Sequence, residues 1–242
     1  NSGYAGEGGT YNFVNNYYKP GAATKQSIVA RIFQPNADDG TNQQPKGVWG
    51  TFYVAGNYVD GTAPYDNVRA GADKIAATNA DNWNGIHPNT KNAPLPEEGI
   101  KATNEYNAGS VTTHSAQVAY EKVVALAGAS LSRDAQDERI AQEIVAGTYT
   151  YTGSKLGGLG IIDHTNDVGG WSELLSTNPP IDSDEDGIPD AWEQLNDLDL
   201  NDEDDASLAW HDGTGYTALD VYLHSLVDHI VRPAQSDGKG VE

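Results

Sequence analysis

The feature that most constrains the fold is the run of acidic residues between positions 181 and 212. It contains 13 Asp or Glu residues and no Lys or Arg. Carboxylates at this density repel one another and disfavour a compact structure. The segment is therefore predicted either to be disordered or to fold around bound divalent cations.

Residues 182–193 match a twelve-residue calcium-binding loop of the EF-hand type. Asp stands at loop positions 1, 3, 5 and 9, Gly at position 6 and Glu at position 12. Calcium prefers six to eight oxygen ligands, and the Gly permits the sharp turn between the ligands. A stabilising role for the ion is favoured over a catalytic one, because the loop supplies neither a base nor an open catalytic position. The predicted Ca²⁺ ligands are Asp182, Asp184, Asp186, the carbonyl of Ile188, Asp190 and Glu193.

Two further segments resemble cation-binding sites but offer fewer carboxylate ligands. Residues 210–221 align with the first loop but keep only Asp212 as a carboxylate at a ligand position, so they are predicted to support the fold without binding an ion. Asp199, Asn201 and Asp205 are spaced two and four positions apart. Their oxygens suggest a second, weaker cation site.

Charge is distributed unevenly along the chain, which carries a formal net charge of -21. Residues 1–155 contain 12 basic and 15 acidic side chains, whereas residues 156–242 contain 2 and 20. A nucleic-acid binder that depends on a broad basic face is therefore excluded. No stretch approaches the roughly 20 apolar residues of a membrane helix. The absence of Cys excludes disulfides and thiolate chemistry.

The first sixty residues suggest a parallel β-helix. Asn16-Tyr17 precedes Asn57-Tyr58 in a similar context 41 positions later, which suggests stacked coils of roughly twenty residues with Asn side chains stacked between them. An ordinary antiparallel sheet with Asn in its turns is the alternative. The runs rich in β-branched and aromatic residues are 11–18, 27–33 and 50–59.

The rest of the chain predicts a mainly β fold with helical additions. Helices are expected at 115–127 and 134–146, and a last helix at about 217–231 that stops before Pro233. The predicted organisation is terminal β-helix coils at 1–60, wrapping loops at 61–111, a helical pair at 112–147, a Gly-rich return segment at 148–180, an EF-hand-like calcium module at 181–232 and a tail at 233–242.

Several segments, taken in order, resemble the C-terminal half of secreted bacterial pectate lyases of polysaccharide lyase family 1. The acidic loop with its Trp-Glu ending also resembles thrombospondin type 3 repeats. The segments that carry the resemblance are 4–24 (YAGEGGTYNFVNNYYKPGAAT), 111–132 (VTTHSAQVAYEKVVALAGASLS), 160–171 (GIIDHTNDVGGW), 182–193 (DSDEDGIPDAWE) and 215–227 (GYTALDVYLHSLV).

The resemblance implies a secreted enzyme with a right-handed parallel β-helix fold. Such an enzyme cleaves polygalacturonate, or pectin, by β-elimination with the help of calcium and an Arg base. In that family the acidic calcium ligands and the catalytic Arg come from coils that precede the Asn-Asn-Tyr-Tyr strand. Here that strand starts at about residue 11. The resemblance therefore implies that the catalytic residues lie outside this chain, and we expect a second chain to carry the preceding coils.

Two basic residues at the ends of strand runs, Lys19 and Arg31, are candidates for binding an acidic polymer. The leading hypothesis is thus the C-terminal part of an extracellular pectate lyase. The alternative is a non-catalytic, calcium-stabilised extracellular module that binds polysaccharide or assembles with copies of itself.

Overall fold

The computed structural model describes residues 3–41, 43–155 and 157–241, and it divides into two compact units. Unit 1 comprises the described residues within 1–127, 135–171 and 237–242. Unit 2 comprises residues 128–134 and 172–236. The predicted calcium module at 181–232 therefore lies within unit 2, and Lys19 and Arg31 lie within unit 1.

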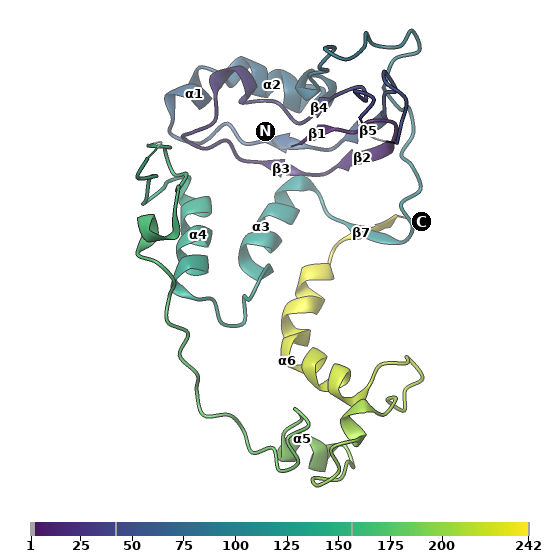
Figure 1. The fold of residues 1–242 in the computed structure, drawn as a ribbon, viewed down its shortest axis with the longest axis vertical. Coiled ribbons are helices and arrows are strands. Elements are labelled where there is room, and N and C mark those ends of the chain that lie inside the picture. The colour runs from purple at the N-terminus through teal and green to yellow at the C-terminus, as the bar shows by residue number, and fades with distance from the viewer. Residues whose placement is uncertain (1–2, 42, 156, 242) are drawn as a thin grey trace. The chain divides into compact units, whose positions relative to one another are not determined.

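Unit 1 begins with short strands that pair in parallel with strands of the next layer (Figure 1). The runs at 11–18 and 50–59 contain these strands, as predicted, and Asn16 and Asn57 stand 41 positions apart, where the layers meet. Isolated parallel bridges from Phe33 to Ile86 and from Phe52 to Lys101 continue the stacking. The pairs are β1 (Tyr4–Ala5) with β4 (Gln34–Pro35), β2 (Thr10–Val14) with β5 (Thr51–Ala55), and β3 (Tyr17–Tyr18) with β6 (Tyr58–Val59).

The run at 27–33 was expected to be a strand, and this prediction is wrong. A 3₁₀ turn occupies Gln26–Ile28, and the backbone N–H of Arg31 donates to the carbonyl of Ile28 at 3.1 Å. The following residues are buried almost without alternation, because they fill the interior of the unit. Paired residues of β2 and β5, and of β3 and β6, are consequently 41 positions apart in the sequence, and not about twenty.

An asparagine ladder closes the turns between the strands, as the sequence predicted. The amide nitrogen of Asn16 donates to Oδ1 of Asn57 at 2.9 Å. Asn57 in turn donates through Nδ2 to Oδ1 of Asn82 at 3.2 Å and to the carbonyl of Phe13 at 2.7 Å. Asn57 is 4% exposed, so these bonds satisfy polar groups that water does not reach.

The core of unit 1 gathers aromatic and aliphatic side chains between the stacked strands. The rings of Phe13 and Phe33 lie 4.6 Å apart, and those of Phe33 and Phe52 lie 5.0 Å apart. Two helices pack beside the strands where only wrapping loops were expected, and they bury Val68 and Ile75. These helices are α1 (Asp66–Arg69) and α2 (Ala72–Ala80).

The predicted helical pair is confirmed. α3 (Ala116–Leu126) begins after Ser115, whose hydroxyl caps its first turn, and α4 (Ala135–Ala146) follows. The predicted tail contains β8 (Lys239–Val241), which pairs antiparallel with β7 (Val111–Thr113).

Unit 2 contains α5 (Asp190–Leu195) and α6 (Ala218–Gln235). α6 begins close to the predicted start, with Thr217 as its cap, but Pro233 lies inside the last turn of the helix instead of after its end. The small core consists of buried Ile188, Ala206 and Ala218, and Trp192 and Trp210 pack against it. The ring centroids of the two Trp side chains lie 5.5 Å apart. In the described parts of the chain, no helix is both long enough and apolar enough to cross a membrane.

Candidate functional site

The predicted calcium loop folds so that its first three Asp side chains converge. Asp182, Asp184 and Asp186 each offer a carboxylate oxygen, and these oxygens all lie within 4.8 Å of one another. The turn is held by backbone N–H groups that donate to the same side chains: Ile188 to Oδ1 of Asp186 at 2.7 Å, and Gly187 to Oδ2 of Asp182 at 3.1 Å. Gly187 has a φ of 98°, which glycine adopts readily.

A second group of carboxylates adjoins the first and shares Asp186 with it. Oxygens of Asp186, Glu193 and Asp205 lie within 4.8 Å of one another. Glu193 projects from α5 and is 0% exposed, and Asp205 begins a 3₁₀ turn at Asp205–Ser207 and is 5% exposed. Two separate segments of unit 2 thus bring buried carboxylates to the end of the loop.

Within the described residues, six carboxylate oxygens of this cluster are buried and have no hydrogen-bond donor. A buried, unpaired charge costs several kcal/mol, because water no longer solvates it. Six oxygens are also the number that Ca²⁺ requires as a minimum. The donor set therefore fits a hard divalent cation. The oxygens are Asp182 Oδ1, Asp184 Oδ2, Asp186 Oδ2, Glu193 Oε1, Glu193 Oε2 and Asp205 Oδ1.

The electrostatics of the cluster favour a cation for the same reason. Burial, followed by repulsion from the nearby carboxylates of Asp184, Asp186, Asp205 and Asp190, raises the pKa of Glu193 to about 7. The pKa of Asp186 is also raised, chiefly by burial. Without a positive charge nearby, the folded chain disfavours the ionised forms that an ion would need as ligands.

Asp190, the predicted ligand at loop position 9, is directed elsewhere. Its Oδ1 accepts from the backbone N–H of Ser183 and its Oδ2 from the Ser183 hydroxyl, both at 2.8 Å. Asp190 therefore closes the loop onto the start of α5. Ile188 is fully buried in the core of unit 2, and its carbonyl as a ligand stays a prediction.

The structure does not bring Asp199, Asn201 and Asp205 together as a separate site. The backbone N–H of Asp199 donates to Oδ2 of Asp205 at 2.9 Å, and the backbone N–H of Asn201 donates to Oδ1 of Asp199 at 3.2 Å. Asp205 instead joins the main cluster through its other oxygen. The sequence did not indicate this role, because Asp205 is one of four consecutive acidic residues at 202–205 and nothing in that run sets it apart.

In the loop at 210–221, Asp212, the one carboxylate at a predicted ligand position, accepts hydrogen bonds within a turn. Oδ1 of Asp212 accepts from the backbone N–H of Thr214 at 2.9 Å and from its hydroxyl at 2.7 Å. These bonds lower the pKa of Asp212. The backbone N–H of Trp210 donates to the carbonyl of Tyr216 at 2.7 Å, which holds the loop beside the core of unit 2.

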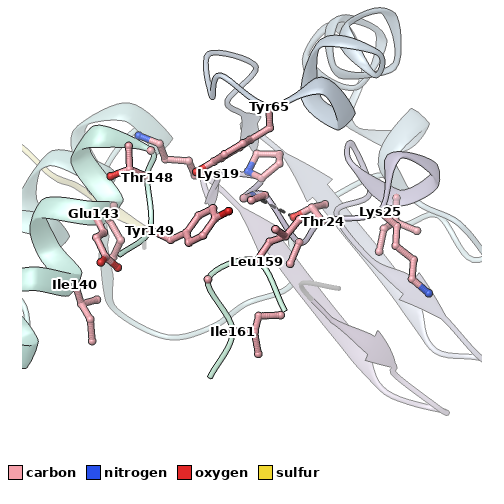
Figure 2. A pocket seen from close by; sticks show the side chains of 18 of the residues that line it. Lys19, Thr24, Lys25, Tyr65, Ile140, Glu143, Thr148, Tyr149, Leu159 and Ile161 are labelled. Carbon is pink, nitrogen blue, oxygen red and sulfur yellow. Dashed lines mark hydrogen bonds between the residues drawn. The ribbon is translucent and has the colours of Figure 1, made fainter. Parts of the chain in front are cut away.

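Unit 1 contains a pocket of about 850 Å³ beside α4. Figure 2 shows Tyr149 within it, with Tyr65, Thr24 and Leu159 around it. The rings of Tyr65 and Tyr149 lie 6.4 Å apart. Both basic residues singled out in the sequence, Lys19 and Arg31, line this pocket.

Lys19 is held by several groups. Its Nζ lies 3.7 Å from Oδ2 of buried Asp60 and donates to the carbonyl of Val145 at 3.2 Å and to the hydroxyl of Tyr120 at 3.3 Å. It therefore ties the end of β3 to α3 and α4, and its charge is largely balanced by Asp60.

Arg31 is less completely paired. One of its terminal nitrogens donates to Oε1 of Gln34, but Nε is buried and has no acceptor among the described residues. Burial lowers the pKa of Arg31. The ligand-facing contribution of Arg31 is its positive charge on the pocket wall, which favours an anionic ligand there.

Comparison with known proteins finds partial similarity. Over 105 residues, 43% of this chain, it is 35% identical to a protein named "Probable pectate lyase C" from Aspergillus flavus, and equally to one of the same name from Aspergillus oryzae. Over 100 residues it is 34% identical to a protein of that name from Emericella nidulans. No family model matches, and no solved structure matches.

The matched region spans about one fifth of the length of these relatives (22%, 22% and 21%). The chain is thus related to pectate lyases over part of its length.

Proposed function

We propose that this chain is the C-terminal part of an extracellular, calcium-dependent pectate lyase that cleaves polygalacturonate by β-elimination. The observation that carries the proposal is the similarity to the proteins named probable pectate lyase C. The main catalytic residues are assigned outside the chain, because the bacterial family that the sequence resembles supplies its catalytic Arg before the Asn-Asn-Tyr-Tyr strand. The relatives' name and this resemblance agree on the substrate class.

We further propose that the strands of unit 1 are coils of a right-handed parallel β-helix. The parallel pairing of β2 with β5 and of β3 with β6 supports this, since both pairs share a spacing of 41 residues. The ladder from Asn16 through Asn57 to Asn82 also supports it, because stacked amides satisfy the turns of successive coils.

In this proposal calcium stabilises unit 2. The six unpaired carboxylate oxygens support a bound divalent cation, and Asp182, Asp184, Asp186 and Glu193 would hold it. When bound, the ion supplies the positive charge that offsets their mutual repulsion. Because only the folded unit assembles these oxygens, calcium shifts the equilibrium toward the folded state.

The pocket of unit 1 is proposed as a contact site for the acidic polymer. Arg31 supports this assignment through its positive charge on the pocket wall, and Tyr65 and Tyr149 provide aromatic surface for a sugar ring. Lys19 contributes mainly by holding the pocket wall, since Asp60 and Val145 already engage its amine.

The second candidate function is a non-catalytic, calcium-stabilised module that binds polysaccharide. The pocket favours it, because the pocket lies within unit 1 and needs no catalytic group. The second chain expected from the sequence finds no support in the comparisons and stays a prediction.

Affinity electrophoresis in gels that contain polygalacturonate tests the proposal, combined with absorbance measurements of unsaturated products. The expected result for the 242-residue chain with calcium is retardation by polygalacturonate, less retardation by a neutral polysaccharide, and no product. Product formation by the chain alone would contradict the placement of the catalytic residues. Equal retardation by both polymers would favour the second candidate, and no retardation would contradict the substrate class.

A further inference from the structure

Asp205 lies outside the twelve-residue loop, yet its carboxylate belongs to the same cluster. One of its oxygens lies within 4.8 Å of oxygens from Asp186 and Glu193. Asp205 is only 5% exposed, and its Oδ1 has no hydrogen-bond donor among the described residues. Its other oxygen, Oδ2, accepts from the backbone N–H of Asp199 at 2.9 Å, so the orientation of the carboxylate is fixed.

Asp190 stands at loop position 9, where the loop motif expects a ligand. Both oxygens of Asp190 accept from Ser183. They are therefore already satisfied, whereas the oxygens of Glu193 and Oδ1 of Asp205 are not. Calcium tolerates variable ligand positions as long as six to eight oxygens surround it.

We propose that Asp205 is a direct ligand of the cation bound by the 182–193 loop and takes the place of Asp190. The assignment rests on the proposed calcium site and extends it to a residue that a loop motif does not include. Three observations support it: oxygens of Glu193 and Asp205 lie within 4.8 Å of each other, both residues are buried, and both carry oxygens without a hydrogen-bond donor among the described residues.

The consequence is a mechanical link within unit 2. Asp205 begins the 3₁₀ turn that contains Ala206, and Ala206 packs against Ile188 of the loop in the small core. An ion held by both segments fastens residues 196–205 to the loop. Binding would therefore order the long acidic segment as well as the loop itself.

Isothermal titration of the full chain with CaCl₂ tests the proposal. Asp205→Asn removes one ligand charge, and Asp202→Asn is the matched control. Asp202 is exposed, lies three residues away and stands in neither carboxylate group. The expected result is a loss of at least about tenfold in calcium affinity for Asp205→Asn and less than about twofold for Asp202→Asn.

If Asp205→Asn binds no calcium at all, its unfolding temperature in a chelator and in calcium distinguishes a lost ligand from a misfolded variant. In a chelator, Asp205→Asn is expected to unfold at a higher temperature than the wild type, because it relieves repulsion with Glu193 and Asp186. With calcium the order is expected to reverse. A residue with only a structural role would lower both temperatures, and that result would overturn the proposal.

The outcomes also separate this inference from the broader proposal. Failure of the wild type to bind calcium would reject the calcium site as a whole. Wild-type binding with unchanged affinity in Asp205→Asn would reject only the role of Asp205. Neither result bears on the binding of polygalacturonate by unit 1.

Discussion

Glu193 and Asp205 place buried carboxylate oxygens within 4.8 Å of each other, although they come from α5 and from a 3₁₀ turn beyond it. Two buried carboxylates at this distance repel strongly in a protein interior. Such a pair persists in a fold when a cation or a proton lies between the two groups. The folding of the acidic C-terminal segment is therefore expected to depend on a cation or a proton bound at this pair.

Removing calcium is expected to destabilise unit 2 and to leave unit 1 unchanged, because the carboxylate cluster lies entirely within unit 2. At a calcium concentration of 100 times Kd, the ion contributes about 2.7 kcal/mol to the free energy of unfolding. Scanning calorimetry with calcium and then with a chelator should show one transition that shifts and one that does not. Two transitions that shift together would contradict this assignment.

In a chelator, unit 2 is expected to become less stable as the pH rises. The pKa of Glu193 is raised to about 7 in the folded chain, first by burial and then by the neighbouring carboxylates. A raised pKa means that the folded state holds the proton more tightly. Its contribution is present below the unfolded value of about 4.3 and is lost as the pH passes about 7.

Melting temperatures of unit 2 between about pH 5 and pH 8 check this expectation. Glu193→Gln should flatten the pH dependence in the chelator and should abolish the stabilisation by calcium. Glu203→Gln is the matched control, because Glu203 is exposed on the same acidic segment. An unchanged slope in Glu193→Gln would show that another group causes it.

Replacing Asn57 is expected to destabilise unit 1. Asn57→Ala removes the buried side chain that joins Asn16, Phe13 and Asn82, and it takes a hydrogen bond away from Asn82, which is also buried. The expected loss is about 2–3 kcal/mol in the free energy of unfolding by urea. Asn84→Ala removes one exposed side-chain bond, to the carbonyl of Ala77, and should cost less than about 1 kcal/mol. Equal losses would argue against the ladder.

Arg31→Gln is expected to weaken the binding of oligogalacturonate by about tenfold, the effect of losing one charge-assisted hydrogen bond. Fluorescence or calorimetric titration measures the affinity. Lys46→Gln removes the same charge at an exposed position that does not line the pocket, and it should leave the affinity unchanged. If both variants bind equally well, the pocket is not the site of contact.

Local patterns predicted the elements that depend on local chemistry. The helices expected at 115–127 and about 217–231 start where Ser115 and Thr217 cap α3 and α6, because a hydroxyl at the start of a helix satisfies a backbone N–H. The Asn pair 41 positions apart predicted the ladder between Asn16 and Asn57. The loop motif likewise predicted that Asp182, Asp184 and Asp186 would converge.

The remaining differences come from long-range packing. The run at 27–33 has the composition of a strand, but Val29 and Ile32 fill the interior of unit 1, and the backbone turns to place them there. Pro233 lies in the last turn of α6, where it removes one hydrogen bond near the helix end. The sequence pointed to Asp205 only as part of a separate, weaker site, since its place beside Glu193 depends on how the acidic segment folds back.

A crystal structure of the calcium-loaded chain, with an anomalous difference map, tests the central claim most directly. The account predicts one peak surrounded at about 2.3–2.6 Å by oxygens of Asp182, Asp184, Asp186, Glu193 and Asp205, with Asp190 still bonded to Ser183. A peak coordinated by Asp190 without Asp205, or no peak within the cluster at saturating calcium, would contradict it.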